Sequence, residues 1–199
     1  MHKVFISYHH HNDQAFKDSL VTFNVTHKIF DDQSVDTGDI DDRLDDEAIR
    51  TKIRDEFLKD TTVTILLVGT ETKGRKHIDW ELYSSMYDGM INKKSGILVI
   101  QLPSTNCSSV YATHEGEKQT VYPDILNWTP ITERTEFERR HPFLPDRIID
   151  NLLAPKVKIS VTTWDKITVG TLKYLIDAAY NDRQSCEYDL SRPMRRANS

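Results

Sequence analysis

The apolar residues of this chain fall into short runs separated by amphipathic stretches. Nearly continuous apolar runs predict strands buried on both faces, and such runs lie at 4–8, 27–30, 62–68, 96–102 and 157–161. Apolar residues at three- and four-residue spacing predict helices with one buried face. The two clearest sets are Ile49, Ile53 and Phe57, and Leu172, Leu175, Ile176, Ala179 and Tyr180.

Strands that alternate with helices imply crossover connections and a parallel sheet. The pattern therefore predicts an α/β fold: a flavodoxin-like, doubly wound, mainly parallel five-stranded sheet with helices on both faces. One domain is expected over residues 1–181, with an irregular, proline-punctuated excursion at about 104–156 and a hairpin near 114–117. Residues 182–199 lack apolar periodicity, which predicts a mobile tail.

Composition limits the classes of function. A formal charge of −5 and a pI near 5.9 argue against nucleic acid as a partner. The chain has no apolar run of the roughly 20 residues that a membrane-spanning helix needs, and no room for a signal peptide before the first strand. Cys107 and Cys186 lie far apart in polar settings, which favours a reduced protein. We expect a cytoplasmic protein that contacts neither nucleic acid nor membrane.

Glu81 is the main catalytic candidate. It follows the strand at 62–68 and begins a helix marked by Trp80, Tyr83, Tyr87 and Met90. Open α/β sheets bind ligands at the carboxyl ends of their strands, and a carboxylate fixed there can stabilise a developing cation. A helix N-terminus would keep it ionised. The structural alternative is ordinary: an acid in a first helical turn complements the helix dipole.

Three motifs carry a family resemblance. Val4-Phe5-Ile6-Ser7-Tyr8, with Asp13 shortly after, resembles the opening box of TIR domains. The segments 62–72 and 76–82, the latter reading Lys-His-Ile-Asp-Trp-Glu-Leu, resemble the TIR-like branch found in bacterial Thoeris anti-phage defence. The resemblance covers about residues 3–103, and a strand at Trp164-Asp165 and the final helix also fit. The excursion at 104–156 has no counterpart in it.

The resemblance implies an enzyme that cleaves the nicotinamide–ribose bond of NAD+, with Glu81 as the catalytic residue. NAD+ is then a substrate, and no cofactor is expected. The product would be a cyclic ADP-ribose isomer or a related ADP-ribose signal that activates a separate effector. The resemblance also implies self-association and a phage-derived protein as the trigger. Many relatives place Trp where this chain has His77, which leaves the details of the pocket open.

Seven further residues are expected to bind substrate: Ser7, Tyr8, His9, Asp31, Asp32, His77 and Trp80. Each also has a structural interpretation. Trp80 is either an aromatic wall for a base or a core anchor, His77 is either a ribose or phosphate contact or a loop histidine, and the two aspartates are either ribose contacts or part of a solvated acidic loop. Lys73, Arg75 and Lys76 could neutralise a pyrophosphate or lie on an ordinary surface. His9, His10 and His11 point in diverging directions, so we assign no metal.

Two other classes of function remain. One is a non-catalytic TIR-type module that acts by self-association. The other is a nucleoside deoxyribosyltransferase-like N-glycosidase with Glu81 as nucleophile. A response-regulator receiver fits poorly because it needs acids at the ends of the first and third strands, and these ends read Ser7-Tyr8 and Gly69-Thr70.

Overall fold

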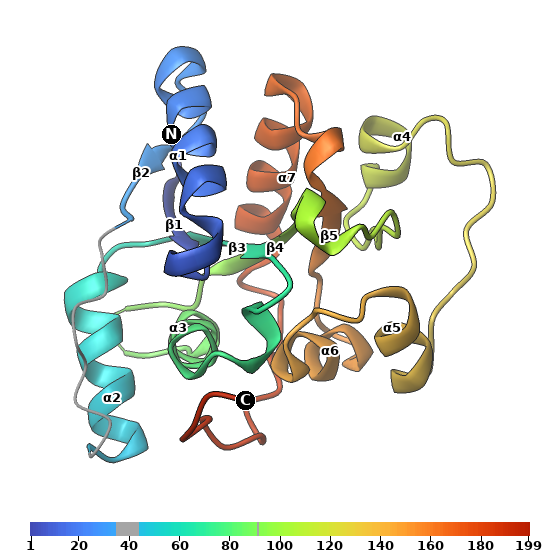
Figure 1. Ribbon diagram of the computed structural model, residues 1–199. Coiled ribbons are helices and arrows are strands. Elements are labelled where there is room, and N and C mark those ends of the chain that lie inside the picture. Colours follow the sequence, from blue (N-terminus) through green and yellow to red (C-terminus); the bar gives the residue numbers. More distant parts are fainter. Residues whose placement is uncertain (35–43, 91) are drawn as a thin grey trace.

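A five-stranded sheet forms the centre of the protein, shown in Figure 1 as a computed structural model that describes residues 1–34, 44–90 and 92–199. The strand order is β2-β1-β3-β4-β5, and each neighbouring pair is parallel. The strands are β1 (Lys3–Ser7), β2 (Asp31–Asp32), β3 (Val63–Val68), β4 (Gly96–Gln101) and β5 (Ser160–Thr163). All residues of β3 and β4 are buried, as expected of central strands covered on both faces. The predicted flavodoxin-like class is confirmed.

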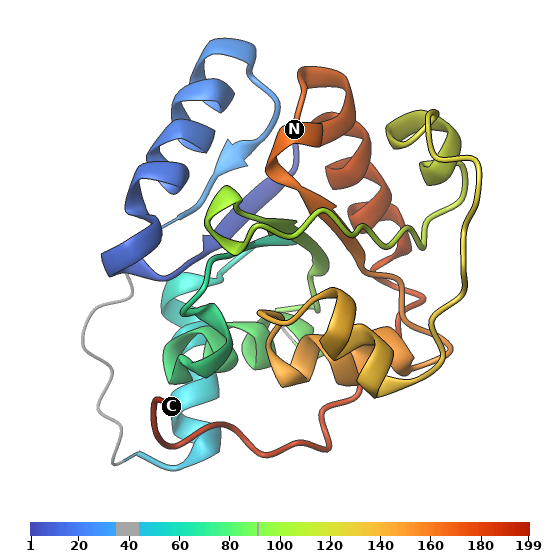
Figure 2. The same ribbon diagram turned by 45° about the vertical axis from the view of Figure 1, so that its right-hand side comes forward.

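Helices cover both faces of this sheet (Figures 1 and 2). On one face lie α1 (His10–His27), α4 (Glu117–Val121) and α7 (Val169–Asp182). On the other lie α2 (Asp46–Lys52), which continues as a π-helix over Ile53–Phe57, and α3 (Lys76–Met86), α5 (Arg134–Arg140) and α6 (Asp146–Leu153). Short 3₁₀ turns occupy Thr72–Gly74, Pro103–Thr105 and Trp164–Lys166.

The apolar core has three parts. Leu20 of α1 and Leu175 of α7 belong to the cluster on the first face, and Leu82 of α3 and Ile148 of α6 belong to the cluster on the second. A third cluster lies where α2 and α3 meet the edge of the sheet. It contains Phe5, Ile49, Ile53, Leu58, Trp80 and Met194.

The side of β1 on which successive strands are added changes between β2 and β3. It leaves β1 for the edge strand β2 and then returns to β3 on the other side of β1. The carboxyl ends of β1 and β3, at Ser7 and Val68, therefore flank a topological switch point. Sheets of this order bind ligands at that place.

The predictions for β2 and β5 were wrong in position. Helix α1 continues through His27, and Lys28 ends it in the left-handed conformation with φ of 52°. The Asn24 side chain accepts hydrogen bonds from the backbone N–H groups of Ile29 and Phe30, so this segment is a turn and not a strand. At the other edge, β5 begins at Ser160, three residues later than predicted, and Trp164–Lys166 is a 3₁₀ turn where a strand was expected.

The acid-rich loop expected after Phe30 is only partly described. Asp31 and Asp32 form β2 instead, and Asp45 caps α2 by accepting a hydrogen bond from the backbone N–H of Ala48 at 2.8 Å. The turn predicted at Thr37-Gly38-Asp39 lies outside the described residues.

The excursion at 104–156 contains α4, α5 and α6, so its predicted irregularity is only partly right. Gly116, with φ of 76°, precedes α4, and no hairpin forms at 114–117. Tyr111 pairs antiparallel with Val161 next to the sheet. Gln101, the last residue of β4, bonds the carbonyl of Ser109 at 2.7 Å and the ring of His141 at 3.1 Å. These contacts attach the excursion to β4 and β5.

The segment after α7 packs along the domain, where the sequence analysis predicts a mobile tail. It runs below α6 and ends near α2 and α3 (Figures 1 and 2). Cys186 and Met194 are buried, and the Tyr188 hydroxyl donates to the carbonyl of Ser95 at 3.0 Å. The apolar anchors are too widely spaced to give a helical or strand pattern, which is why the sequence does not indicate this packing.

Candidate active site

Glu81 lies against the carboxyl end of β1. The Ser7 hydroxyl donates a hydrogen bond of 2.6 Å to Glu81 Oε2, and both residues are buried, with 1% and 3% of their surfaces exposed. Ser7 is the last residue of β1 and pairs in register with Leu66 of β3. The contact therefore places the carboxylate at the β1/β3 switch point, where the sequence predicts only a position at the carboxyl ends of the strands.

The position of Glu81 within its helix differs from the prediction. Helix α3 begins at Lys76, so Glu81 lies in the second turn. The favourable effect of a helix N-terminus on an acid falls off within the first turn. The helix dipole therefore explains neither the predicted ionisation of Glu81 nor the presence of an acid at this position. The hydrogen bond from Ser7 helps to hold the carboxylate in this orientation.

Asp13 is a second buried carboxylate at the same edge of the sheet. It is 2% exposed in the first turn of α1, which begins at His10, and its Oδ2 atom has no hydrogen-bond partner among the described residues. Burial raises its pKa from 3.8 to about 6. A side chain at Gly69, directly after β3, would place a Cβ 2.4 Å from both carboxylate oxygens of Asp13. Only glycine allows this approach.

Asp13 is a site residue that the sequence analysis missed. It appears there only as part of the opening motif. In the structure His9 occupies the capping position without a side-chain hydrogen bond. The available signal was an acid in the first turn of the helix after β1 combined with a glycine directly after β3, because both positions lie at the switch point.

His9 follows β1 and is half-buried. Burial and the neighbouring Arg75 guanidinium lower the pKa of the His9 ring, which favours the neutral form. Arg75 pairs with Glu71 at 2.7 Å. The structure therefore brings His9 near the loop between β3 and α3.

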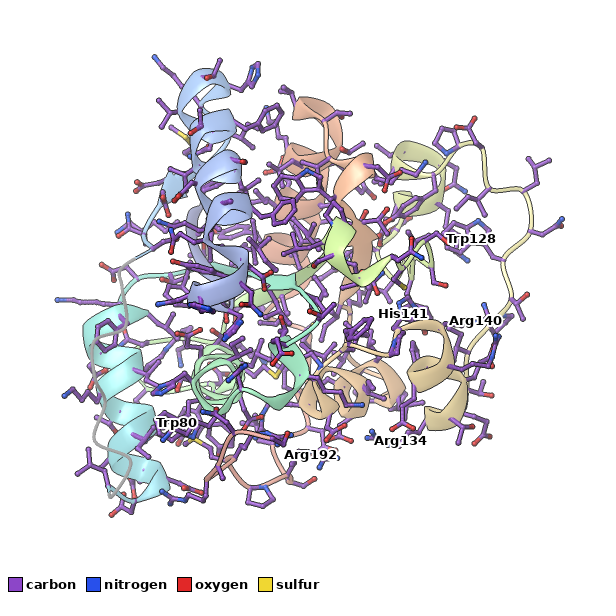
Figure 3. All side chains as sticks on the ribbon, viewed as in Figure 1. Trp80, Trp128, Arg134, Arg140, His141 and Arg192 are labelled. Carbon is purple, nitrogen blue, oxygen red and sulfur yellow. The ribbon has the colours of Figure 1, made fainter. Side chains whose placement is uncertain are left out.

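The three aromatic candidates have different settings. Tyr8 is 5% exposed and its hydroxyl donates to Gln14 Oε1 at 2.6 Å. Trp80 is fully buried in the third core cluster, so the core interpretation of this residue holds (Figure 3). His77 is half-buried and packs edge-on against Trp80, with ring centres 4.9 Å apart.

Asp31 and Asp32 lie away from this site. They pair with Lys3 and Val4 at the amino end of β1. At about 3.3 Å per residue, four residues along β1 separate the level of Asp31 from that of Ser7 by about 13 Å. Asp32 instead accepts a hydrogen bond from the backbone N–H of Ser34 at 2.9 Å, a local turn contact. The structure does not bring these aspartates to Glu81.

The three basic residues that precede Glu81 lie beside acidic or aromatic side chains. Lys73 lies 3.7 Å from Asp146 of α6, Arg75 pairs with Glu71, and the Lys76 ammonium lies 5.4 Å from the ring centre of Trp80. The described part of the chain holds no group of three or more His, Cys, Asp or Glu side chains able to bind a metal. Within the same residues, no helix has the length and apolarity needed to cross a bilayer.

Fold and site together define a flavodoxin-like domain whose buried carboxylate lies at the switch point of the sheet. A family model described as the TIR-like domain of Thoeris protein ThsB matches residues 5–107, a little over half of the chain. The chain belongs to this family and is a TIR-type module of anti-phage defence. The matched range contains Ser7, Asp13, Gly69 and Glu81. No curated protein and no solved structure matched the chain.

Proposed function

We propose that this protein cleaves the nicotinamide–ribose bond of NAD+ and that Glu81 promotes the step. The C1′–N bond breaks, its electron pair leaves with neutral nicotinamide, and the ribose carbon becomes oxocarbenium-like. A fixed anion beside that carbon stabilises the charge as it develops. The observation that carries the proposal is the 2.6 Å hydrogen bond that fixes Glu81 at the switch point.

The proposed product is a cyclic ADP-ribose isomer or a related ADP-ribose derivative. A hydroxyl or adenine nitrogen of the same molecule would capture the cationic carbon and release a proton, giving a cyclic product and nicotinamide. A closed site that excludes water favours this capture over hydrolysis. The product would diffuse to a separate effector of the defence system, in keeping with the Thoeris family.

The burial of Glu81 supports a protein that rests in a closed state. With 3% of its surface exposed, the residue can meet a dinucleotide only after the surrounding side chains move. We propose that a phage-derived protein, together with self-association, produces this opening. The same burial favours the second candidate function, a non-catalytic TIR-type module in which Glu81 and Ser7 only stabilise the fold.

The test compares three proteins in phage-infected cells: the wild type, Glu81→Gln and the matched control Glu47→Gln. Glu47 is an exposed residue of α2, so its substitution makes the same chemical change away from the site. We expect nicotinamide release and a new ADP-ribose species, measured by mass spectrometry, from the wild type and the control only.

Equal NAD+ consumption by wild type and Glu81→Gln would remove Glu81 from the mechanism. If infection changes NAD+ in none of the three, the non-catalytic module is the better account. A ribosyl adduct on Glu81 would favour the N-glycosidase with a covalent intermediate.

A further inference from the structure

The final segment of the chain lies directly under the helix that carries Glu81. Residues Arg192–Ser199, named here the α3 strap, pass below α6 and end beside the beginning of α3 (Figures 1 and 2). The strap lies outside the range matched by the family model, which ends at residue 107. The family match therefore does not account for the contacts of the strap.

The strap bonds the residues immediately before Glu81. The backbone N–H of Arg195 donates to Asp79 Oδ2 and the Arg195 carbonyl accepts from Trp80 Nε1, both at 2.8 Å. Farther along, Asn198 Oδ1 accepts from the backbone N–H of Lys76 at 3.0 Å. The N–H of Ser199 reaches the carbonyl of Gly74 at 3.1 Å. These contacts run from the turn before α3 up to the residue adjacent to Glu81.

A buried arginine joins α3, α6 and the strap. Arg147 of α6 is fully buried and donates from Nε and Nη2 to the two oxygens of Asp79, at 2.8 and 3.0 Å. The same guanidinium donates to the carbonyls of Arg192 and Pro193, at 3.0 and 3.2 Å. A buried guanidinium needs its hydrogen-bond partners. Loss of the strap would therefore remove acceptors from the group that also holds Asp79.

One apolar anchor fastens the strap. Met194 is 4% exposed and lies in the third core cluster with Trp80. Beside it lies a cavity of about 220 Å³, bordered by the strap, the loop before α3 and the beginning of α6. Its charged lining residues are Lys73, Arg75, Asp79, Asp146, Arg192 and Arg195. A segment held by one buried side chain and a set of polar contacts can detach without unfolding the sheet.

We propose that the α3 strap positions Glu81 for catalysis, with Asp79, Trp80 and Arg147 as the positioning residues. This inference rests on the proposed NAD+ cleavage. Asp79 and Trp80 directly precede Glu81, so the strap fixes the turn of α3 from which the carboxylate reaches Ser7. A reacting group displaced by about 1 Å can lose a factor of about 100 in rate. Release of the strap therefore lowers the rate by displacing Glu81.

The test uses the full chain with Met194→Asp, which puts a charge into the apolar anchor point. The matched control is Ala197→Asp, which adds the same charge at an exposed strap residue. Hydrogen exchange of the purified proteins reports the strap amides, the α3 amides (76–86) and the α7 amides (169–182). NAD+ turnover in lysates of phage-infected cells, which contain the trigger, gives kcat and KM. If Met194→Asp does not fold, Met194→Ala, which only shortens the anchor, takes its place.

We expect Met194→Asp to speed hydrogen exchange in both the strap and α3 by at least about 10-fold and to leave α7 unchanged. We also expect it to lower kcat by about 10- to 100-fold while KM stays nearly constant. A peptide of residues 191–199 added to this variant should restore protection of α3 and part of kcat, whereas the peptide carrying the same Asp should not. Ala197→Asp should behave as the wild type.

Two results would overturn the inference: a released strap with unchanged α3 exchange, or loosened α3 with wild-type kcat. Failure of the wild type to cleave NAD+ in lysates of phage-infected cells would instead reject the proposed function, and α3 exchange alone would then show whether the strap holds this helix.

Discussion

The Ser7 hydroxyl and the Glu81 carboxylate, 74 positions apart in the chain, form a buried hydrogen bond of 2.6 Å. Ser7 ends β1, whereas Glu81 lies on the helix that follows β3. The bond therefore joins the two elements that border the switch point of the sheet. It also orients the carboxylate that we propose as the catalytic group.

Replacing Ser7 with alanine removes this donor while leaving Glu81 in place. A buried hydrogen bond to a charged group contributes about 1.5–3 kcal/mol. We expect Ser7→Ala to lower the rate of NAD+ cleavage by about 10- to 100-fold, since 1.4 kcal/mol is a factor of about 10. Initial rates of nicotinamide release in lysates of phage-infected cells measure the effect. Ser19→Ala, which removes an exposed hydroxyl from α1, is the control and should keep the wild-type rate. A wild-type rate for Ser7→Ala would show that this bond does not position Glu81.

Breaking the Asp79–Arg147 ion pair should destabilise the protein strongly. Asp79→Asn leaves the fully buried guanidinium of Arg147 without its counter-charge, and removing one partner of such a pair costs about 3–5 kcal/mol. Urea unfolding measures the loss. The double variant Asp79→Asn/Arg147→Met should recover part of it because no buried charge remains. A cost under about 1 kcal/mol for Asp79→Asn, or additive losses in the double variant, would contradict the pairing.

Asp13 should make the protein less stable as the pH rises. Its pKa of about 6 in the folded protein lies above the ordinary value of 3.8, so the folded state holds the proton more tightly. The contribution of Asp13 to stability is then highest at low pH, falls between about pH 4 and pH 6, and stays level above that.

Asp13→Asn removes this ionisation. We expect the variant to gain about 1–3 kcal/mol over the wild type at pH 7.5, and the difference to vanish near pH 4. Urea unfolding at several pH values tests this. Asp18→Asn, an exposed change on the same helix, should leave the pH dependence unaltered. If the difference in unfolding free energy between Asp13→Asn and the wild type does not change with pH, Asp13 is not the titrating group.

His141 should act in the opposite direction. Burial lowers its pKa from 6.5 to about 4, and Arg140 adds to the effect. The unfolded chain takes up the proton first, so stability is lost as the pH falls from about 6.5 to about 4, by about 3 kcal/mol in total.

His141→Asn keeps a donor for Gln101 Oε1 but cannot titrate, so its stability should vary less than that of the wild type over this range. Chemical denaturation at pH 7 and pH 4.5 provides the comparison. His27→Asn, at the exposed end of α1, is the control. If the wild type and His141→Asn lose equal stability on acidification, a different group is responsible.

Local pattern located the central strands but not the edges. The runs at 62–68 and 96–102 agree with β3 and β4 to within one residue, because these strands are buried on both faces and must be apolar throughout. The edge strand β2 consists of Asp31 and Asp32, whose side chains carry no apolar signal. Pairing with β1, a long-range contact, creates this strand. The same reason applies to β5, of which Thr162 and Thr163 are part.

The sequence by itself determined the fold class, the family and the place of Glu81 after β3, since each depends on residue types at short spacing. The tertiary structure decided which groups meet. It brought Ser7 to Glu81 and Asp13 to Gly69, it placed Asp31 and Asp32 at the other end of β1, and it packed Arg192–Ser199 under α3. The physical reason is that each of these contacts joins segments that lie far apart in the chain. Contacts of that kind leave no periodic pattern in a chain, so only the packed fold shows them.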